Sequence, residues 1–368
     1  MSQNVAELAD IEDFDNVIDE AETDDAVVPQ RYDISSFGAD YDVDGIVRRL
    51  NRKDIFIPPF QRDYVWKITE ASRFIESLLL GLPVPGVFLA KEPDTNKLLV
   101  IDGQQRLKTL QFFYDGLFDP KQEERTHRVF SLTKVQSNFE GLTYDTLAES
   151  DRLKLDNSII HATVVRQEMP RNDDTSIYHI FERLNNGGRR LTPQEIRTAL
   201  YHGTLVDLMK HLNDYNTWRQ IYGKKSNRLK DEELILRFLA LYFDLERYEK
   251  PMEEFLNKFA SKHRNAEEEF LIEAQRLFVD TMEVVFQSFG KEAFRPERAL
   301  NAAVFDSVMV GLAKRVTLGP VTDTTALVNA YTTLFEDDDY LRAISRATSN
   351  EASVEARITK AIQAFANI

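Results

Sequence analysis

The chain has 368 residues, of which 43% are hydrophobic and 29% charged, proportions that are ordinary for a soluble globular protein. It has no run of about 18 apolar residues and no basic start followed by an apolar stretch, so neither a membrane span nor a secretory signal is expected. The absence of cysteine excludes disulfides and thiolate metal sites, and it favours a reducing, cytoplasmic location.

The net charge of −15 is spread unevenly along the chain. Residues 1–30 hold ten acidic side chains and no Lys or Arg, so the other 338 residues together carry only −5. We expect residues 1–30 to form a solvated, disordered acidic tail, and a sharper hypothesis is that this tail shields a basic groove as a DNA mimic. Since the acidic excess belongs mainly to the tail, a local basic site for nucleic acid is not excluded.

Residues 31–170 have the pattern of a small mixed α/β domain. A short strand is followed by a helix near residues 42–52. The prolines at 58–59 require an extended path, because the second disfavours helix at the first and neither can donate to a sheet. Helical spacing then returns, with Thr69 as the expected N-cap and Gly81 at the end of the helix.

Two short apolar runs, "GVFLAKE" and "KLLVID", are separated by the turn residues "PDTN" and predict a β-hairpin. The second run ends at Asp102 and Gly103, and a helix is expected to follow directly. After a less regular stretch, "ERTHRVFSL" and "SIIHATVVRQE" are typical of strands.

Residues 171–368 predict an all-α domain. One helix is stopped by an Asn-Gly-Gly turn, and the next, in "LTPQEIRTALYHGTLVDLMKHLN", begins with a capping box. In that box Thr192 is the N-cap, Pro193 is the first helical residue and Glu195 is the third. Further segments with apolar residues three and four apart indicate helices that each bury one face. The predicted fold class is therefore α+β, with a small mixed α/β domain followed by an all-α helical domain.

Several familiar catalytic motifs are missing from the sequence. Gly81 and Gly86 have the separation of a phosphate-binding loop, but the lysine and hydroxyl residue that should follow are absent. There is no G-x-G-x-x-G, no metal-binding histidine pair and no convincing Asp…Glu-x-Lys nuclease core. The last 105 residues contain no histidine, which excludes a histidine-metal nuclease module there. Each of the six histidines, His161 among them, is expected to be an ordinary surface or core residue.

The stretch "LVIDGQQRLKTL" is the first candidate site. A strand that turns through glycine into a helix exposes backbone N–H groups at the positive end of the helix dipole, which attracts phosphate. Gly103 permits close approach of a ligand, and Arg106 can add a bidentate clamp. Gln104 and Gln105 can bind a phosphate, a base edge or an attacking water. Asp102 can hold Mg²⁺ directly or through water.

A plainer interpretation of the same stretch is that Asp102 caps a helix and Arg106 is a surface charge. Upstream, Gln61 and Arg62 form a second Gln-Arg pair on the extended loop. A second polar cluster surrounds a tight turn between two helices, where its density of Arg would suit an anion or the DNA backbone. Its residues are Arg183, Asn185, Gly188, Arg189 and Arg190.

Three stretches taken together, "IPPFQRDYVW", "VIDGQQRLKTL" and "IFERLNNGGRRLTPQEIR", closely resemble the N-terminal domain of GmrSD-type modification-dependent restriction proteins. That domain is related to the ParB and sulfiredoxin folds, and the resemblance covers about residues 40–205. The C-terminal "ISRATSNEASVEARI" also resembles the end of stand-alone members of the family, and the sequence departs from other members in lacking the C-terminal histidine-metal nuclease module. The common Tyr-Gln-Arg is Phe60-Gln61-Arg62 here, so any role of a tyrosine hydroxyl is lost.

The resemblance implies that the Gly-x-x-Arg turn, residues 103–106, binds nucleotide phosphates beside Asp102, with an NTP and Mg²⁺ as expected cofactors. The leading hypothesis is a nucleotide-binding, NTP-hydrolysing subunit of an anti-phage restriction system. Arg106 and Arg62 would stabilise the transferring phosphoryl group, and Gln61 or Gln105 would orient water. DNA and a separately encoded nuclease or effector are the expected partners.

Three alternatives stay open at this point. The first is a DNA-binding sensor, in which the same pocket would bind a DNA phosphate or a modified base and no NTP would be hydrolysed. The second is an interaction module, in which the helical half would bind a partner protein through an apolar patch. A self-contained nuclease is the least favoured interpretation, because no metal-binding nuclease core is visible.

Overall fold

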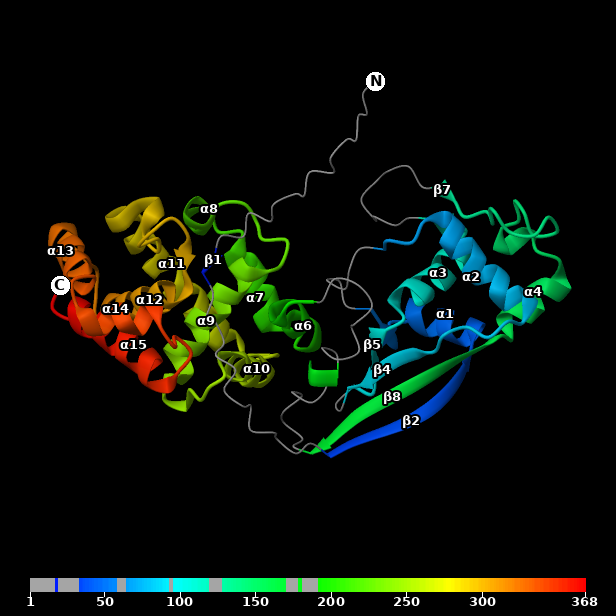
Figure 1. Cartoon of the computed structure of the whole chain (residues 1–368), viewed down its shortest axis with the longest axis horizontal. Helices are drawn as coiled ribbons and strands as arrows, with labels where there is room; N and C mark the ends of the chain where they lie inside the picture. The colour runs from blue at the N-terminus through cyan, green and yellow to red at the C-terminus, as the bar shows by residue number, and fades with distance from the viewer. Residues whose placement is uncertain are drawn as a thin grey trace, which may run out of the picture. The chain divides into compact units, whose positions relative to one another are not determined.

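The computed structural model describes residues 17–18, 33–57, 64–92, 95–118, 128–169, 178–180 and 191–368. The chain divides into two compact units (Figure 1). The N-terminal unit comprises Pro29–Tyr201, and the helical unit comprises His202–Ile368 together with Met1–Val28. The first contains a mixed sheet with helices and the second is almost entirely helical, which confirms the predicted α+β class.

The centre of the N-terminal unit is a five-stranded mixed sheet with the strand order β2-β8-β4-β5-β3. β8 pairs antiparallel with β2 and parallel with β4, and β4 and β5 form the predicted antiparallel hairpin. A separate two-stranded ladder joins β6 to β7. The strands are β2 (Asp33–Asp42), β3 (Ile55–Phe56), β4 (Val87–Lys91), β5 (Leu98–Asp102), β6 (Leu117–Phe118), β7 (Arg128–Val129) and β8 (Ile159–Met169).

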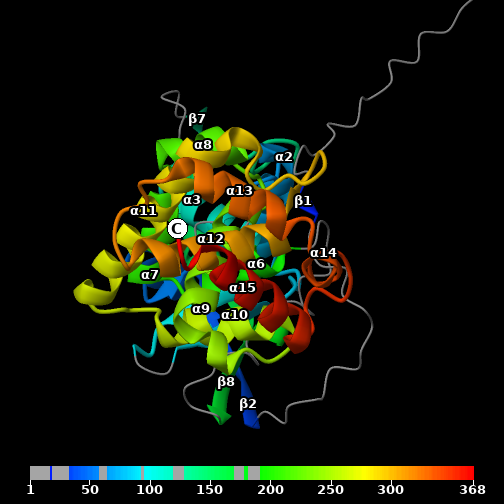
Figure 2. The same ribbon diagram turned by 90° about the vertical axis from the view of Figure 1, so that its left-hand side faces the viewer.

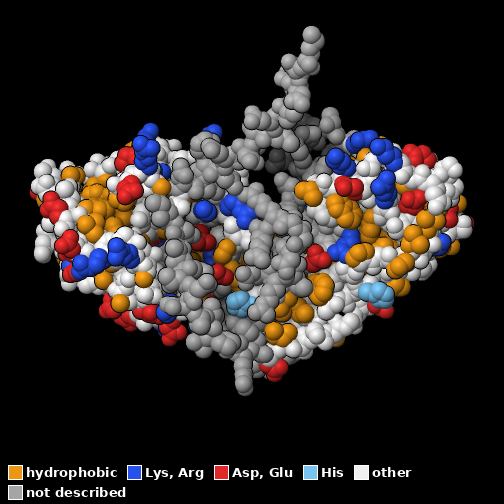
Figure 3. All heavy atoms as spheres, in the orientation of Figure 1, with side chains coloured by type: hydrophobic (Ala, Val, Ile, Leu, Met, Phe, Trp, Pro, Cys, Tyr) orange, Lys and Arg blue, Asp and Glu red, His pale blue; other side chains and the backbone are white. Residues whose placement is uncertain are grey.

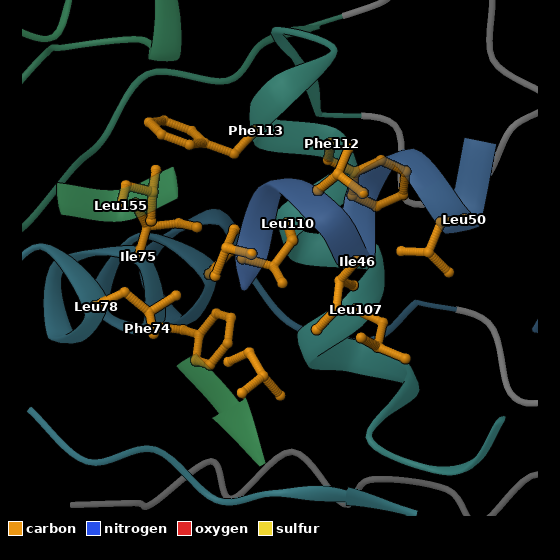
Figure 4. Packing of buried hydrophobic residues seen from close by; sticks show 14 of the residues in the cluster. Ile46, Leu50, Phe74, Ile75, Leu78, Leu107, Leu110, Phe112, Phe113 and Leu155 are labelled. Carbon is orange, nitrogen blue, oxygen red and sulfur yellow. The ribbon is translucent and has the colours of Figure 1, made fainter. Parts of the chain in front are cut away.

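Helices cover one face of this sheet and form the hydrophobic core with it. Alternate strand residues, such as Leu89 on β4 and Val164 on β8, join the same buried cluster as the helices, because successive side chains of a strand point to opposite faces. Figure 4 shows Ile46, Phe74 and Leu110 from three helices meeting in this core. The helices of this unit are α1 (Val43–Asn51), α2 (Ile68–Leu80), α3 (Gln104–Tyr114), α4 (Glu149–Asp156) and α6 (Pro193–Leu200).

The caps of these helices agree with the sequence predictions at two positions and differ at one. α2 begins one residue before the predicted N-cap, so the assignment of Thr69 was wrong: Lys67 is the N-cap, and its N–H donates to the Glu70 carboxylate at 2.7 Å. Gly81 ends α2 in the left-handed conformation (φ 74°), as expected. The capping box of α6 is confirmed, since the Glu195 N–H donates to the Thr192 hydroxyl at 3.2 Å.

The helix predicted to follow that capping box is two helices. α6 ends at Leu200 and α7 begins at Thr204. Between them the backbone of Gly203 lies so close to Arg264 that a Cβ at residue 203 would be 2.2 Å from the Arg264 carbonyl oxygen. The close approach of a neighbouring segment therefore requires glycine there, and the periodic pattern of apolar residues gave no sign of the break.

In the helical unit, α12 lies at the centre and packs against α9, α11 and α15 (Figure 2).

Within the acidic segment of residues 1–30, the structure describes only β1 (Val17–Ile18), which pairs in parallel with β9 (Leu300–Asn301). Among the described helices none combines the length and apolar character needed to cross a membrane. The helices are α7 (Thr204–Asn213), α8 (Asn216–Tyr222), α9 (Lys230–Asp244), α10 (Met252–Lys262), α11 (Glu268–Phe289), α12 (Ala302–Val316), α13 (Thr324–Leu334), α14 (Asp338–Ser345) and α15 (Glu351–Phe365).

A buried ionic cluster ties three of these helices together. The Asp306 carboxylate on α12 accepts two hydrogen bonds from Arg237 on α9, at 3.0 and 2.6 Å, and one from Arg357 on α15 at 2.9 Å. All three residues are almost completely buried. Removing the shared acceptor would leave two guanidinium groups in a dry interior without their counter-ion.

We expect Asp306→Asn to destabilise the helical unit by about 3–5 kcal/mol, the usual cost of breaking a buried ion pair. The measurement is urea unfolding of the full chain followed by Trp218 fluorescence in a Trp66→Phe background, since these are the two tryptophans of the chain. Asp339→Asn is the matched control, because Asp339 is an exposed partner of Arg342. Equal effects of the two substitutions would contradict a dominant role for the buried cluster.

A buried glutamate at the start of α9 makes the stability of this unit depend on pH. Burial, reinforced by the neighbouring Asp231 carboxylate, raises the pKa of Glu232 to about 7. Its Oε2 atom is buried without a hydrogen-bond partner among the described residues. Since an unfolded glutamate has a pKa of about 4.3, the folded state binds the extra proton between these values, and stability falls as pH rises through that window.

Glu232→Gln should therefore stabilise the helical unit at pH values above about 7, by up to about 3 kcal/mol, with the gain vanishing near pH 4. Urea unfolding followed by Trp218 fluorescence at both pH extremes measures this difference. Glu268→Gln, a change at an exposed glutamate on α11, serves as the control. A gain of the same size at both pH extremes would show that proton uptake by Glu232 is not its origin.

Candidate functional site

The turn from β5 into α3 is built around a glycine that no other residue can replace without strain. Asp102 ends β5, and Gly103 is the N-cap of α3 with φ 102° and ψ 8°, a left-handed conformation. A Cβ at Gly103 would lie 2.5 Å from Cγ1 of Val87 on β4. The glycine is thus required twice, by its backbone angle and by the close packing of the turn against the neighbouring strand.

Arg106 lies in the first helical turn of α3, and its side chain links the end of β5 to the residues that precede β4. Its Nη1 donates to the carbonyl oxygens of Pro85 and Gly86, at 2.7 and 2.6 Å, and its Nη2 donates to Asp102 Oδ2 at 2.8 Å. The side chain is only 14% exposed. Arg106 is therefore not a surface charge, and since Gly103 is the N-cap, Asp102 does not cap the helix; the plainer interpretation of this stretch was wrong.

Gln105 points to a different part of the unit from Arg106. Its Oε1 accepts hydrogen bonds from the backbone N–H groups of Val65 and Trp66, at 3.0 and 3.3 Å. The Tyr64 hydroxyl also lies 2.6 Å from the Thr109 hydroxyl on α3. These contacts fix the segment that follows the first Gln-Arg pair onto the first two turns of α3.

Two of the predicted groups fall on residues that the structure does not describe. These are the upstream pair and the second polar cluster, namely Gln61, Arg62, Arg183, Asn185, Gly188, Arg189 and Arg190. Their predicted roles stay predictions. Gln104 is described as the first residue of α3.

Asp102 and Arg106 line a pocket of about 480 Å³ on the sheet face opposite the helices. A bulge between Phe88 and Leu89 shifts the register of the hairpin, so that Asp102 lies directly opposite Phe88. Phe88 in turn pairs with Thr163 on β8, and Thr163 pairs with Gly38 on β2. One row of residues across four strands therefore forms the floor of the pocket.

The other side of the pocket carries a His-Asp pair that the sequence did not reveal. His161 on β8 and Asp40 on β2 are direct cross-strand partners, and His161 Nδ1 lies 2.5 Å from Asp40 Oδ1. Both side chains line the pocket and are exposed. The alternating pattern of "SIIHATVV" places His161 and Thr163 on one face, but nothing in the sequence pairs them with a residue 121 positions away.

The charges of the pocket bear on what it can hold. Its ionisable side chains are two carboxylates, one guanidinium and one imidazole. Within the described parts of the chain no three His, Asp or Glu side chains gather as a metal site. Mg²⁺ is often held by one or two carboxylates plus substrate phosphates, so Asp102 fits a Mg²⁺ that arrives with a nucleotide rather than a caged metal.

The fold and site define an α+β domain with a polar pocket where a strand turns through glycine into a helix. Residues 44–202 match the sequence model of the GmrSD restriction endonuclease, N-terminal domain. This segment therefore belongs to the GmrSD N-terminal domain family, which confirms the predicted family and indicates a component of a restriction system. The comparison with curated proteins gave no match. The matched segment includes all the residues that line the pocket except Gly38 and Asp40.

We expect Gly103→Ala to destabilise the N-terminal unit by about 2–5 kcal/mol, from the left-handed backbone cost plus the clash with Val87. In a double-mutant cycle, Val87→Ala should relieve the part of the loss that comes from Cγ1, since Cβ of residue 87 would still lie 3.0 Å from the new methyl group. Hydrogen exchange of peptides from α3, resolved by mass spectrometry, measures both effects. Gly116→Ala is a control for the backbone cost alone, because Gly116 also has a positive φ but a Cβ there would meet no atom within 4 Å. Identical losses at the two glycines would contradict the packing argument.

Proposed function

We propose that this chain is a nucleotide-binding, NTP-hydrolysing component of a restriction system that senses DNA modification. The observation that carries the proposal is the link made by Gln105, which joins the segment after Gln61-Arg62 to the helix that bears Arg106. Only Asp63 and Tyr64 separate Arg62 from Val65 in the sequence. The contact of Gln105 with Val65 and Trp66 therefore supports the proposal that both Gln-Arg pairs serve one site.

Arg106 keeps donors for a phosphate after its structural bonds are made. A guanidinium has five N–H donors. Three of those on Arg106 are used by Pro85, Gly86 and Asp102, and the other two have no partner among the described residues. Two donors are what a bidentate contact to a phosphate needs. The bonds to the two carbonyls would hold the guanidinium in place, so that little order is lost when the nucleotide binds.

The other residues of the motif take distinct roles in this proposal. The Oε1 of Gln105 is occupied by two backbone donors, so Gln105 positions the upstream loop, and Gln61 is the residue that orients the attacking water. Arg62 and Arg106 stabilise the negative charge that develops on the transferring phosphoryl group. Asp102 holds Mg²⁺ together with the nucleotide phosphates, and Gly103 and Gln104 provide the helix N-terminus for the phosphates.

DNA and a separately encoded nuclease or effector are the proposed partners, with the nucleotide state coupling recognition to cleavage. The alternative is a DNA sensor without NTP turnover. On the face drawn in Figure 3, basic side chains are interspersed with acidic and hydrophobic ones among the described residues. The described residues of that face form no basic stripe, and the predicted Arg-rich cluster lies in residues 181–190, outside the described residues.

The test is a hydrolysis panel with the four common NTPs and Mg²⁺, with and without plain or modified duplex DNA. We expect one or more NTPs to be hydrolysed, and Arg106→Ala to reduce turnover by about 100-fold or more, as loss of a charge-stabilising donor does. Arg106→Lys keeps the charge but loses the planar fork, so it should recover little.

Arg73→Ala on the exposed surface of α2 is the control for the loss of an arginine. Circular dichroism and Trp66 fluorescence of each variant check that the N-terminal unit is intact. Calorimetry that detects no binding of any common NTP to the wild-type chain would refute the proposed function. Unchanged turnover by a folded Arg106→Ala variant would show that Arg106 has only a structural role, through its hydrogen bonds to Pro85, Gly86 and Asp102.

A further inference from the structure

We propose that His161 is the general base of the pocket and that Asp40 is its positioning residue. This inference rests on the proposed NTP hydrolysis and assigns the proton acceptor for the same reaction. The two residues form a cross-strand pair between β8 and β2, on the side of the pocket across from Asp102 and Arg106.

The pair fixes the tautomer of the imidazole. Nδ1 of His161 lies 2.5 Å from Oδ1 of Asp40, and an ionised carboxylate can only accept a hydrogen bond. Nδ1 therefore carries the hydrogen, which leaves Nε2 with the lone pair that a general base needs. The backbone at His161 is held as well, because Gly86, the residue before β4, packs so closely that a Cβ there would lie 2.7 Å from the His161 carbonyl oxygen.

The floor of the pocket leaves room between the base and the phosphate clamp. Neighbouring strands lie about 4.8 Å apart and residues rise about 3.3 Å along a strand, so the Cα atoms of His161 and Asp102 are roughly 12 Å apart. Gly38 has no side chain, and a Cβ built there would meet no atom within 4 Å. A phosphoryl group bound by Arg106 and one water molecule fit across such a gap.

The proposed step balances as a hydrolysis. The water oxygen forms a bond to the γ-phosphorus while the bond from phosphorus to the β–γ bridging oxygen breaks, and its electron pair stays on the nucleoside diphosphate. The proton of the water moves to Nε2 of His161 and is then released to solvent. The charged groups that line the pocket with His161 are Asp40 from β2, Asp102 from β5 and Arg106 from α3, and the lining residues 85–88, at the start of β4 and just before it, carry no charge.

The exposure of the pair argues against a purely structural role. The side chains of His161 and Asp40 are 73% and 62% exposed. Ion pairs as exposed as this contribute little to stability. Substitutions at either position should therefore leave the N-terminal unit folded, so that a change in turnover reports on the reaction.

The experiment measures hydrolysis of the NTP that the wild-type chain turns over, across about pH 5.5–9, in full-length variants. We expect His161→Ala to lower kcat by about 100- to 10,000-fold with nucleotide affinity by calorimetry unchanged, and to remove the acid limb of the pH–rate profile. Added imidazole should restore part of the turnover of His161→Ala and none of that of Arg106→Ala. His211→Ala, an exposed histidine on α7, is the matched control.

Asp40 is tested through its effect on the histidine. Asp40→Ala should lower kcat without changing KM, and Asp40→Asn should restore most of it, because the amide oxygen can accept the same hydrogen bond from Nδ1. In the His161→Ala background Asp40→Ala should have no further effect. Asp33→Asn, at the start of the same strand, is the control.

The results separate this inference from the proposed function. Turnover of His161→Ala within about threefold of wild type would overturn the general base while the NTPase proposal stands. Weaker nucleotide binding with unchanged kcat would also overturn it, because His161 would then be a binding residue. A wild-type chain that binds NTP but hydrolyses none would overturn both proposals together.

Discussion

The contact on which the site depends is the one between Gly103 and Val87. The turn from β5 into α3 passes so close to β4 that a single methyl group would lie 2.5 Å from a valine side chain. Because the turn is this close, the guanidinium of Arg106 can span from the helix to the carbonyls of Pro85 and Gly86, which directly precede β4. The same bonds keep Asp102 beside Arg106, so the packing of one glycine sets the geometry of the whole polar corner.

A rigid corner of this kind has consequences for ligand binding. An arginine on a surface loses rotational freedom about several side-chain bonds when it binds a phosphate. Arg106 has already lost that freedom in folding. Its contact with Asp102 also limits how strongly it attracts an anion, since the carboxylate offsets part of its charge. In the proposed function, a divalent cation that binds Asp102 together with the phosphates would relieve that offset. The arrangement would then favour a nucleotide that brings its own Mg²⁺ over a bare phosphodiester.

Local signals in the sequence predicted much of the fold. The hairpin of β4 and β5 followed from apolar runs around a turn, and α6 followed from its capping box. Two local predictions failed for different reasons. At Gly203 the backbone of Arg264 leaves no room for a Cβ, and such a contact between distant segments leaves no trace in helical periodicity. At the start of α2 the N-cap is Lys67, whose N–H is satisfied by the carboxylate of Glu70, although Thr69 has the more typical side chain for the position.

The site divides in the same way between what is local and what is not. The residues from Asp102 to Arg106 are adjacent in sequence, so a motif could point to them, whereas the pairing of His161 with Asp40 depends on the register of β2 against β8. Asp40 also lies outside residues 44–202, the segment that matches the family. A fragment cut at that boundary would lose β2, and β8 would become an unpaired edge without the carboxylate that holds His161. The folded sheet therefore begins before the matched segment, and the proposed activity has to be measured on a chain that keeps residues 33–42.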